Sequence, residues 1–442
     1  MRKDYKYSRY NIITPIFDNR RIIYNLLAEK LILIHDESIY HDIANNIIPE
    51  SENNFSMLLD GGIIIDDAID ERTMIFDENN KDSADRKALS FTIFPSSNCQ
   101  LGCVYCGQDH KKESLDEVMH NSILTKLEKM IIGKSHLNLS WFGGEPLLGL
   151  STIIKLTPRL KELAKKYNCT YGSRITTNGL LLNEKNLKIL LENGISDLTI
   201  SIDGTKEFHD ARRPTKGGEG SYDVILKNLT IVFRYLRENE IDCGVRLRIN
   251  IDRYNKDCIE DLFVDLIDAG CKGIVTEWDL APIHSWGNDA HERALTFEEF
   301  GELKLDLTIC LLEMGLLEKV PFPGRVKVLC QAITEDSLYL DSKGILYDCS
   351  ETPLVPIHQE KYKLGTIDSS IDELYEKRNY NKWNTEIKNN EYPCGDCNLL
   401  PVCGGGCPKA WKENFRPCPS FKYNIEEYLI LGYLSSVQNL AK

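Results

Sequence analysis

Between residues 89 and 282, short runs of apolar and β-branched residues alternate with longer segments in which apolar residues recur every three or four positions. The short runs predict buried strands, and the longer segments predict amphipathic helices. We expect six strands, at residues 89–94, 137–142, 170–177, 197–202, 245–251 and 272–280. The helices expected between them cover residues 115–132, 151–167, 184–193, 222–240 and 257–269.

This alternation predicts repeated β-α-β units with parallel strands, because a parallel crossover needs a dozen or more residues. We therefore predict an α/β fold in which the strands form a partial (β/α)6 barrel similar to a TIM barrel. In that architecture the loops at the carboxyl ends of the strands carry the functional groups.

Two different segments flank the repeat. Residues 1–88 read as a small α+β module with a strand, a hairpin and helical stretches, and the module ends at the polar linker 77–87. Residues 321–442 are rich in cysteine, glycine and turn residues and end in the helical tail 424–440. We predict three domains, at residues 1–88, 89–320 and 321–442.

Composition and charge narrow the class of protein. The 442 residues are 42% hydrophobic, enough for a sizeable core and too apolar for a disordered chain. The formal net charge of −14 disfavours a nucleic-acid partner. We find neither a membrane-spanning apolar run nor an apolar signal segment, so we expect a cytoplasmic protein. Fifteen cysteines in a reducing compartment favour metal binding over disulfides.

The segment "SNCQLGCVYC" follows the first predicted strand and holds Cys99, Cys103 and Cys106. Three cysteines cannot all pair with one another as disulfides. A zinc site would usually take four protein ligands, often including histidine, and no histidine falls within this run. Thiolates suit iron–sulfur clusters, and three of them would leave one iron of a cubane cluster open for chemistry.

Polar groups also follow the next three strands. The second ends in "GGEP", with Gly143, Gly144 and Glu145, where paired glycines would let a ligand approach the backbone. A carboxylate beside them could accept a hydrogen bond from an ammonium group. The third strand ends in "TTNG" (176–179) and the fourth in "SIDG" (201–204). Either tetrapeptide alone is typical of a simple turn, but together they predict one polar rim.

These four motifs, in this order, resemble the radical S-adenosylmethionine (radical SAM) superfamily. The resemblance covers about residues 89–282 and implies that Cys99, Cys103 and Cys106 bind a [4Fe–4S] cluster. It also implies that the open iron chelates SAM, which is cleaved reductively to a 5′-deoxyadenosyl radical. An electron donor such as flavodoxin or ferredoxin is implied as a partner.

The same resemblance carries over to the residues that would contact SAM. Gly143, Gly144 and Glu145 match the segment that meets its amino group, and Tyr105 matches an aromatic residue near the adenine. Ser201 and Arg213 match positions at the ribose and carboxylate, although the adjacent Arg212 leaves the register of the arginine open. The implied set of cofactor-binding residues is Tyr105, Gly143, Gly144, Glu145, Thr177, Asn178, Ser201, Asp203 and Arg213.

A second cysteine signal lies downstream and resembles the SPASM extension of radical SAM enzymes. By this resemblance, two auxiliary [4Fe–4S] clusters bring the total to three. One would be held by Cys394, Cys397, Cys403 and Cys418, and the other by Cys330, Cys349 and Cys407. The second set lacks a fourth protein ligand, so Cys310 would serve as a distant substitute or one iron would stay open.

The alternative reading of the C-terminal cysteines is a pair of zinc knuckles, since paired cysteines often bind zinc. The remaining cysteines, which fall within strand or helix patterns, are expected to pack in the core. These are Cys169, Cys243, Cys258 and Cys271.

Enzymes with SPASM extensions include peptide maturases and anaerobic sulfatase-maturating enzymes. In the latter an aspartate that acts as a base follows the cysteine that matches Cys349, whereas Ser350 stands there in this chain, with Asp348 and Glu351 close by. The pattern of residues 1–88 resembles the winged-helix peptide-recognition element of peptide maturases. This module would bind the leader of a precursor peptide by adding a strand to a sheet edge; the alternative is a scaffold that supports the barrel.

The expected function is therefore a peptide maturase that abstracts hydrogen from a ribosomally synthesised precursor peptide and installs a thioether or C–C crosslink. The alternatives are a protein oxidase of the sulfatase-maturase kind and a non-catalytic iron–sulfur protein that binds peptides. After the sixth strand, His284, Trp286 and Asp289 are candidates to line the substrate entrance. An ordinary loop with a half-buried tryptophan is the alternative there.

Overall fold

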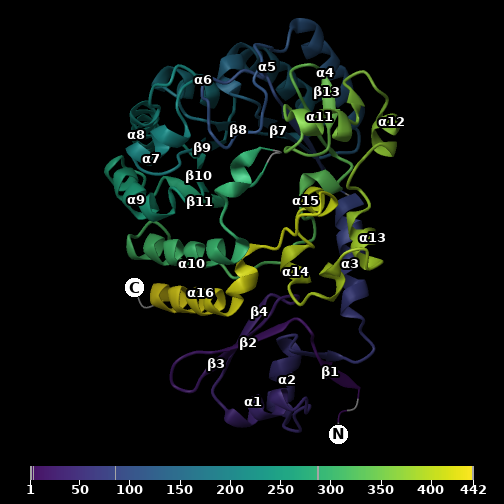
Figure 1. Ribbon diagram of the computed structural model, residues 1–442. Coiled ribbons are helices and arrows are strands. Elements are labelled where there is room, and N and C mark those ends of the chain that lie inside the picture. Colours follow the sequence, from purple (N-terminus) through teal and green to yellow (C-terminus); the bar gives the residue numbers. More distant parts are fainter. Residues whose placement is uncertain (1, 3, 85, 286–287, 441–442) are drawn as a thin grey trace. The chain divides into compact units, whose positions relative to one another are not determined.

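The computed structural model describes residues 2, 4–84, 86–285 and 288–440 (Figure 1). The chain divides into two compact units. Unit 1 comprises residues 1–85, 297–333 and 380–442, and unit 2 comprises residues 86–296 and 334–379. These units cut across the segment 321–442 that the sequence predicts as one domain, and the three predicted domains stay a prediction.

Unit 2 contains a nine-stranded sheet with the order β11-β10-β9-β8-β7-β6-β12-β13-β14. Its six strands from β11 to β6 are parallel and neighbour one another in sequence order, which confirms the predicted α/β fold. They are β6 (Ala88–Ile93), β7 (His136–Trp141), β8 (Thr170–Thr177), β9 (Asp197–Ser201), β10 (Gly244–Ile251) and β11 (Val275–Pro282).

Helices connect these strands, and their apolar faces explain why they form. In α9 (Ile259–Asp268) the buried residues Ile259, Leu262, Phe263 and Leu266 share one face. The other connecting helices are α4 (Glu117–Met130), α5 (Leu150–Lys166), α6 (Glu184–Glu192), α7 (Lys206–Arg212) and α8 (Tyr222–Glu238). The short helix α7 was not expected from the sequence.

The parallel strands have one apolar and one polar face. Along β10, Val245, Leu247, Ile249 and Ile251 are fully buried, whereas the alternate residues are partly exposed. The alternate residues Arg246 and Arg248 pair with Glu277 and Asp279 of the neighbouring β11. The second face of the sheet is therefore lined with charged and polar groups.

Three strands from the cysteine-rich region extend this sheet. β12 (Ser337–Leu340) pairs in parallel with β6, and β13 (Ile345–Tyr347) and β14 (Gly365–Thr366) follow in antiparallel order. Cys349, two residues after β13, thus belongs to the same unit as the first cysteine run. Unit 2 also contains α11 (Pro356–Tyr362) and α12 (Ile371–Glu376).

In unit 1 the N-terminal residues form the small α+β module that the sequence predicts. Its strands β2 (Asn11–Pro15), β3 (Arg21–Asn25) and β4 (Lys30–Ile34) form an antiparallel sheet, and β1 (Tyr5–Tyr7) pairs with β5 (Ile64–Asp66). With α1 (Glu37–Ala44) and α2 (Glu52–Asp60), they enclose a core that includes Ile23, Phe55 and Leu58. The resemblance of this module to a winged helix stays a prediction.

The predicted linker 77–87 is wrong for most of its length, because α3 (Glu71–Ala84) covers it. The helix buries Ile75, Phe76, Asn79 and Ser83. Its Arg72 donates to the Lys388 carbonyl of α13 (Trp383–Lys388) at 2.9 Å. A single buried stripe, hidden among many polar residues, therefore makes this segment a helix.

The rest of unit 1 contains helices joined by loops. It contains α10 (Phe297–Glu313), α14 (Leu400–Cys403), α15 (Pro408–Lys412) and α16 (Ile425–Leu440), the last of which confirms the predicted helical tail. Short 3-10 turns occur at η5 (Pro393–Asp396) and η6 (Ser420–Tyr423). Within the described residues, no helix has the length and apolar character that a membrane span requires.

Candidate functional site

The predicted motifs follow the ends of four adjacent parallel strands. The cysteine run follows β6, Gly143–Glu145 follow β7, Asn178 follows β8, and Asp203 follows β9. Since the carboxyl ends of parallel strands meet at one edge of a sheet, these groups share one rim. This placement agrees with the rim that the sequence predicts.

The cysteine run is held along residues 212–216, which begin at the last residue of α7. Gly102 N donates to Pro214 O at 2.8 Å, and Val104 N donates to Arg212 O at 2.9 Å. A third backbone bond runs from Lys216 N to Gln100 O at 2.8 Å. The loop with the three cysteines is therefore fixed by backbone hydrogen bonds to a segment more than a hundred residues downstream.

Gly143 and Gly144 contact the backbone of the same loop. A Cβ atom at Gly143 would lie 2.6 Å from Ser96 O, and one at Gly144 would lie 2.5 Å from Asn98 O. Gly143 also has φ +123°, a conformation that favours glycine. The close approach that the paired glycines permit is thus made by the cysteine loop itself, while their contact with a ligand stays a prediction.

Glu145 is completely buried and links the ends of β7 and β8. Its carboxylate accepts hydrogen bonds from Leu147 N at 2.9 Å, Thr177 Oγ1 at 2.8 Å and Asn178 N at 2.9 Å. Burial raises the pKa of Glu145, and these hydrogen bonds oppose that rise. Asn178 in turn points its Nδ2 at Cys99 Sγ, 3.6 Å away.

Asp203 is the centre of a second buried network, which we call the Asp203 hub: Tyr105, Asp203, Arg212, Arg213 and Asn250. Tyr105 donates to the Asp203 carboxylate and accepts from Arg213 Nη1 at 2.8 Å. Asn250 N donates to Asp203 Oδ1 at 3.0 Å. Burial would raise the pKa of Asp203, but the guanidinium groups of Arg213 and Arg212 outweigh it and hold that pKa below its usual value.

The hub also shows how the two adjacent arginines differ. Arg213 lies 3.5 Å from Asp203 and donates a hydrogen bond to Tyr105 Oη. Arg212 lies 3.8 Å from Asp203 and over the Tyr105 ring, but its hydrogen bonds go to Asp252 and Asn250 O. Both side chains are almost entirely buried. Arg213 is therefore the arginine that is hydrogen-bonded to the Tyr105 hydroxyl of the cysteine loop.

Sequence reasoning missed several residues of this network. Asp203 N donates to His209 Nδ1 at 3.1 Å, and His209 Nε2 lies 3.1 Å from Ser221 Oγ. Burial lowers the pKa of His209 to about 4, so its ring is neutral near pH 7. Asn250 and Asp252 were missed as well, although their place at the end of the fifth strand is the signal that would have indicated them.

The remaining predicted rim residue, Ser201, is the last residue of β9 and is partly buried. Its role at the ribose stays a prediction. The three cysteines of the run are free thiols, and burial raises the pKa of each, to about 12 for Cys103. Arg213 opposes this rise at all three positions. Binding to iron would be needed to ionise such thiols near neutral pH.

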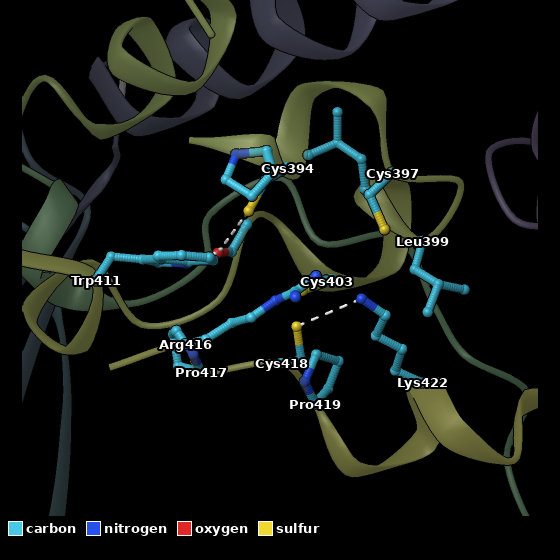
Figure 2. A pocket seen from close by; sticks show the side chains of 13 residues that line it. Cys394, Cys397, Leu399, Cys403, Trp411, Arg416, Pro417, Cys418, Pro419 and Lys422 are labelled. Carbon is cyan, nitrogen blue, oxygen red and sulfur yellow. Dashed lines mark hydrogen bonds between the residues drawn. The ribbon is translucent and has the colours of Figure 1, made fainter. Parts of the chain in front are cut away.

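Figure 2 shows a pocket in unit 1 whose wall carries four of the C-terminal cysteines: Cys394, Cys397, Cys403 and Cys418. Burial raises the pKa of Cys394 to about 12 and that of Cys403 to about 11. Four thiols around one hollow fit the ligand set of a [4Fe–4S] cluster. In the described part of the chain, no three His, Cys, Asp or Glu side chains converge on a single ion, and a cluster spreads its ligands over four irons.

The loop between these cysteines has an unusual backbone. Gly404, Gly405 and Gly406 all have positive φ values. A Cβ atom at Gly406 would lie 2.5 Å from Pro417 O, next to Cys418. Trp411 Nε1 donates to Gly405 O at 2.8 Å, and Cys394 Sγ lies 3.4 Å from the same oxygen. The glycines therefore let this loop bring Cys403 and Cys418 to one pocket.

The other three predicted ligands are divided between the units. Cys349 is buried in unit 2, whereas Cys330 and Cys407 are exposed in unit 1. Their predicted shared cluster, and the role of Cys310 in it, stay predictions. Cys243, Cys258 and Cys271 are buried and Cys169 is partly buried, as expected for packing residues.

The segment after β11 brings His284 to the same rim. His284 Nε2 lies 3.0 Å from Glu351 Oε2. Asn288, from the same segment, donates to Tyr105 O at 3.2 Å, and Asp109 N donates to Leu354 O at 2.7 Å. His284 and Glu351 thus lie on segments that are each hydrogen-bonded to the cysteine loop or to the residues that follow it. Trp286 lies outside the described residues, and Asp289 begins a 3-10 turn (Asp289–Glu292).

Known proteins are similar to this chain in sequence and in fold. Residues 93–266 match the family model described as the Radical SAM superfamily. The chain is 26% identical over 367 residues to the cysteine-type anaerobic sulfatase-maturating enzyme of Clostridium novyi (strain NT). That alignment covers 77% of this chain and 95% of the relative.

Two solved structures have a similar fold. The structure described as native anSMEcpe with bound AdoMet and Cp18Cys peptide is 22% identical, with a TM-score of 0.58, and the match covers 80% of this chain and all of that one. Streptococcus suis SuiB bound to precursor peptide SuiA is 15% identical, with a TM-score of 0.52, and the match covers 94% of this chain and 98% of that one.

Proposed function

The chain contains a radical SAM domain, and from this premise we propose that it is an enzyme that modifies a peptide by radical chemistry. The observation that carries this proposal is the shared rim at which Cys99, Cys103 and Cys106 follow β6 and Glu145, Asn178 and Asp203 follow the next strands. A buried, mutually bonded set of groups at the carboxyl ends of parallel strands is the usual place of a catalytic site.

In this proposal the three cysteines of the rim hold a [4Fe–4S] cluster and the adjacent residues bind SAM. When bound, these cofactors supply a 5′-deoxyadenosyl radical, which takes a hydrogen atom from the substrate. The protein holds the cluster ligands and the residues around SAM in place. Gly143 and Gly144 let the cysteine loop lie against β7, and the Asp203 hub holds Tyr105 between Cys103 and Cys106.

Direct contacts with SAM are assigned in the same proposal. We assign its amino group to the segment from Gly143 to Glu145 and its ribose and carboxylate to Ser201 and Arg213. In the structure, Glu145 and Arg213 already have buried protein partners. They would therefore act on SAM while also bracing the strand ends.

The four-cysteine pocket would hold an auxiliary cluster. This assignment is supported by the four thiols that line the pocket. We assign a third cluster to Cys330, Cys349 and Cys407. An electron leaving the substrate needs an acceptor, and an auxiliary cluster is suited to that role. A flavodoxin or ferredoxin would supply the electron that starts each cycle.

The substrate class is proposed from the relatives. The SuiB structure holds precursor peptide SuiA, and the anSMEcpe structure holds the Cp18Cys peptide. We propose a ribosomally synthesised precursor peptide, crosslinked through a thioether or C–C bond, with its leader added to an edge of the sheet β2-β3-β4. His284, whose Nε2 lies 3.0 Å from Glu351 Oε2, is our candidate to accept a proton from the substrate, because a positioned histidine is a common general base.

The second candidate function is oxidation of a protein side chain, as in sulfatase maturation. It is favoured by the match to the C. novyi relative, which covers nearly the whole length of that enzyme. Ser350, in place of the aspartate that acts as a base in that family, favours the crosslinking function instead. We propose crosslinking first and side-chain oxidation second.

Anaerobic reconstitution with iron and sulfide, followed by incubation with SAM and dithionite, tests the proposal. We expect about twelve irons per chain, as three cubane clusters require, and release of 5′-deoxyadenosine. The variant with Cys99, Cys103 and Cys106 all changed to Ala is expected to lose about four irons and all 5′-deoxyadenosine. Persistent release by that variant would refute the mechanism.

Mass spectrometry of substrates then separates the candidate functions. Precursor peptides encoded beside the gene are co-expressed with the chain, and the Cp18Cys peptide is tested in parallel. Loss of about two mass units with two residues joined in the fragment spectrum indicates a crosslink. Oxidation of one cysteine side chain of the Cp18Cys peptide instead gives a loss of about two mass units as the thioaldehyde, or of about 18 mass units once water replaces its sulfur and releases hydrogen sulfide.

A further inference from the structure

The four-cysteine pocket contains two cations that the proposed function does not explain. Lys422, on η6, and Arg416 both line the pocket (Figure 2). The Lys422 ammonium lies 3.6 Å from Cys418 Sγ, within reach of an N–H···S hydrogen bond. Lys422 therefore directs a positive charge at one of the four sulfurs.

Neither cation has a carboxylate partner among the described residues, unlike neighbouring lysines of the same unit. Lys412 pairs with Glu386 at 3.1 Å, and Lys409 pairs with Glu413 at 2.8 Å. Asp396, between Cys394 and Cys397, lies near Arg9 and Arg72 instead. The charges of Lys422 and Arg416 are thus left to interact with whatever occupies the pocket.

A cubane cluster with four thiolates carries a net negative charge, which grows by one when the cluster takes up an electron. Nearby positive charge and hydrogen bonds to sulfur stabilise the reduced form more than the oxidised form. The effect is strongest where water is scarce, and the pocket wall is made largely of apolar groups such as Leu399, Leu400 and Trp411.

We propose that Lys422, assisted by Arg416, raises the reduction potential of the cluster held by Cys394, Cys397, Cys403 and Cys418, and so makes this cluster the electron acceptor of the reaction. The inference rests on the proposed function. In turnover the electron comes from the substrate carbon radical, which loses one electron to the oxidised cluster and one proton to a base. The reduced cluster later passes the electron to an external acceptor such as oxidised flavodoxin.

The test is a dye-mediated redox titration, followed by electron paramagnetic resonance, on the full chain. Cys99, Cys103, Cys106 and Cys349 are changed to Ala to remove ligands of the other two clusters, and about four irons per chain are expected to remain. In this background, Lys422→Met should shift the reduction equilibrium about tenfold toward the oxidised cluster, which equals about −59 mV for one electron. Arg416→Met should shift it in the same direction.

Two further variants identify charge as the cause. Lys422→Arg keeps the cation and should retain the original potential, and Lys412→Met removes a lysine already paired with Glu386 and should leave the potential unchanged. An unchanged potential in Lys422→Met, with four irons retained, would overturn the inference. An equal fall in Lys422→Arg would overturn it too. A chain in this background with almost no iron refutes the cluster assignment itself, so the two failures are distinguishable.

Discussion

At the scale of single residues, the predicted ligand-binding residues of the site are in direct contact with other parts of the protein. Glu145 is saturated by three donors from two strand ends, and Gly144 lies against the carbonyls of the cysteine loop. Residues that the sequence marks as ligand contacts are therefore also structural braces. Substitutions there should disturb the cysteine loop before they disturb any bound molecule.

Gly144→Ala tests this brace. The added Cβ atom would lie 2.5 Å from Asn98 O and 2.6 Å from Ser97 O, so the cysteine loop must move. We expect loss of about four irons per chain and a fall of about 1–3 kcal/mol in the free energy of unfolding. Gly217→Ala is the control, because its Cβ atom would make only an ordinary contact, at 3.6 Å, with Thr215. Full iron content in Gly144→Ala would contradict the expectation.

His209 predicts a pH dependence at the same scale. Its pKa is about 4 in the folded protein, against a usual 6.5, because of burial and the neighbouring Arg213. The unfolded chain therefore binds more protons between these values, and stability present above about pH 6.5 is lost as the pH falls toward 4. His209→Gln keeps an acceptor for Asp203 N but does not titrate.

We expect the native chain to lose about 2 kcal/mol more of its free energy of unfolding than His209→Gln does between about pH 7 and about pH 5. Urea denaturation at the two pH values measures this difference. Equal losses in both proteins would show that His209 does not remain neutral in the folded state.

At the scale of elements, composition can hide a helix. Residues 77–87 contain many Asp, Asn and Lys residues, which favour a linker. Most of them nevertheless continue α3, and this helix buries Ile75 and Phe76 completely just before them. Two large apolar side chains on one face are enough when another helix is available to cover them. Tertiary packing outweighs weak local preference in such a segment.

Phe76→Ala tests whether α3 is a packed element. Removal of a fully buried phenylalanine is expected to cost about 3–5 kcal/mol in the free energy of unfolding and to expose residues 71–84 to proteases. Met74→Ala is the matched control on the same helix, because Met74 is 38% exposed. Similar small effects of both substitutions would support a flexible linker instead.

At the scale of the whole molecule, unit 2 brings distant segments to one rim. His284 follows the last parallel strand and Glu351 follows β13, yet the two side chains are in contact. The segment of His284 is held near the cysteine loop by a hydrogen bond from Asn288 to Tyr105 O. The segment of Glu351 is held there by a hydrogen bond from Asp109 N to Leu354 O. These contacts would place His284 where it can exchange a proton with the substrate.

His284→Gln is therefore expected to separate two steps. Formation of 5′-deoxyadenosine should stay within about twofold of the native rate, whereas modified peptide should fall about tenfold or more, since general acid–base catalysis contributes at least that much. Mass spectrometry of peptide and nucleoside in one reaction measures both. His136→Gln, at the start of β7 and so at the opposite edge of the sheet, is the control. Undiminished peptide product in His284→Gln would exclude the assigned role.

The sequence by itself determined the parallel α/β sheet, the six strands, the tail helix and the rim on which the cysteine run lies. Hydrophobic periodicity and strand ends are local features, and a local pattern is enough to predict them. Only the tertiary structure decided that β12 pairs with β6, that Arg213 contacts Tyr105, and that Lys422 reaches Cys418. These contacts join segments through strand pairing, burial and loop geometry, and the free energy that selects them comes from the folded chain as a whole.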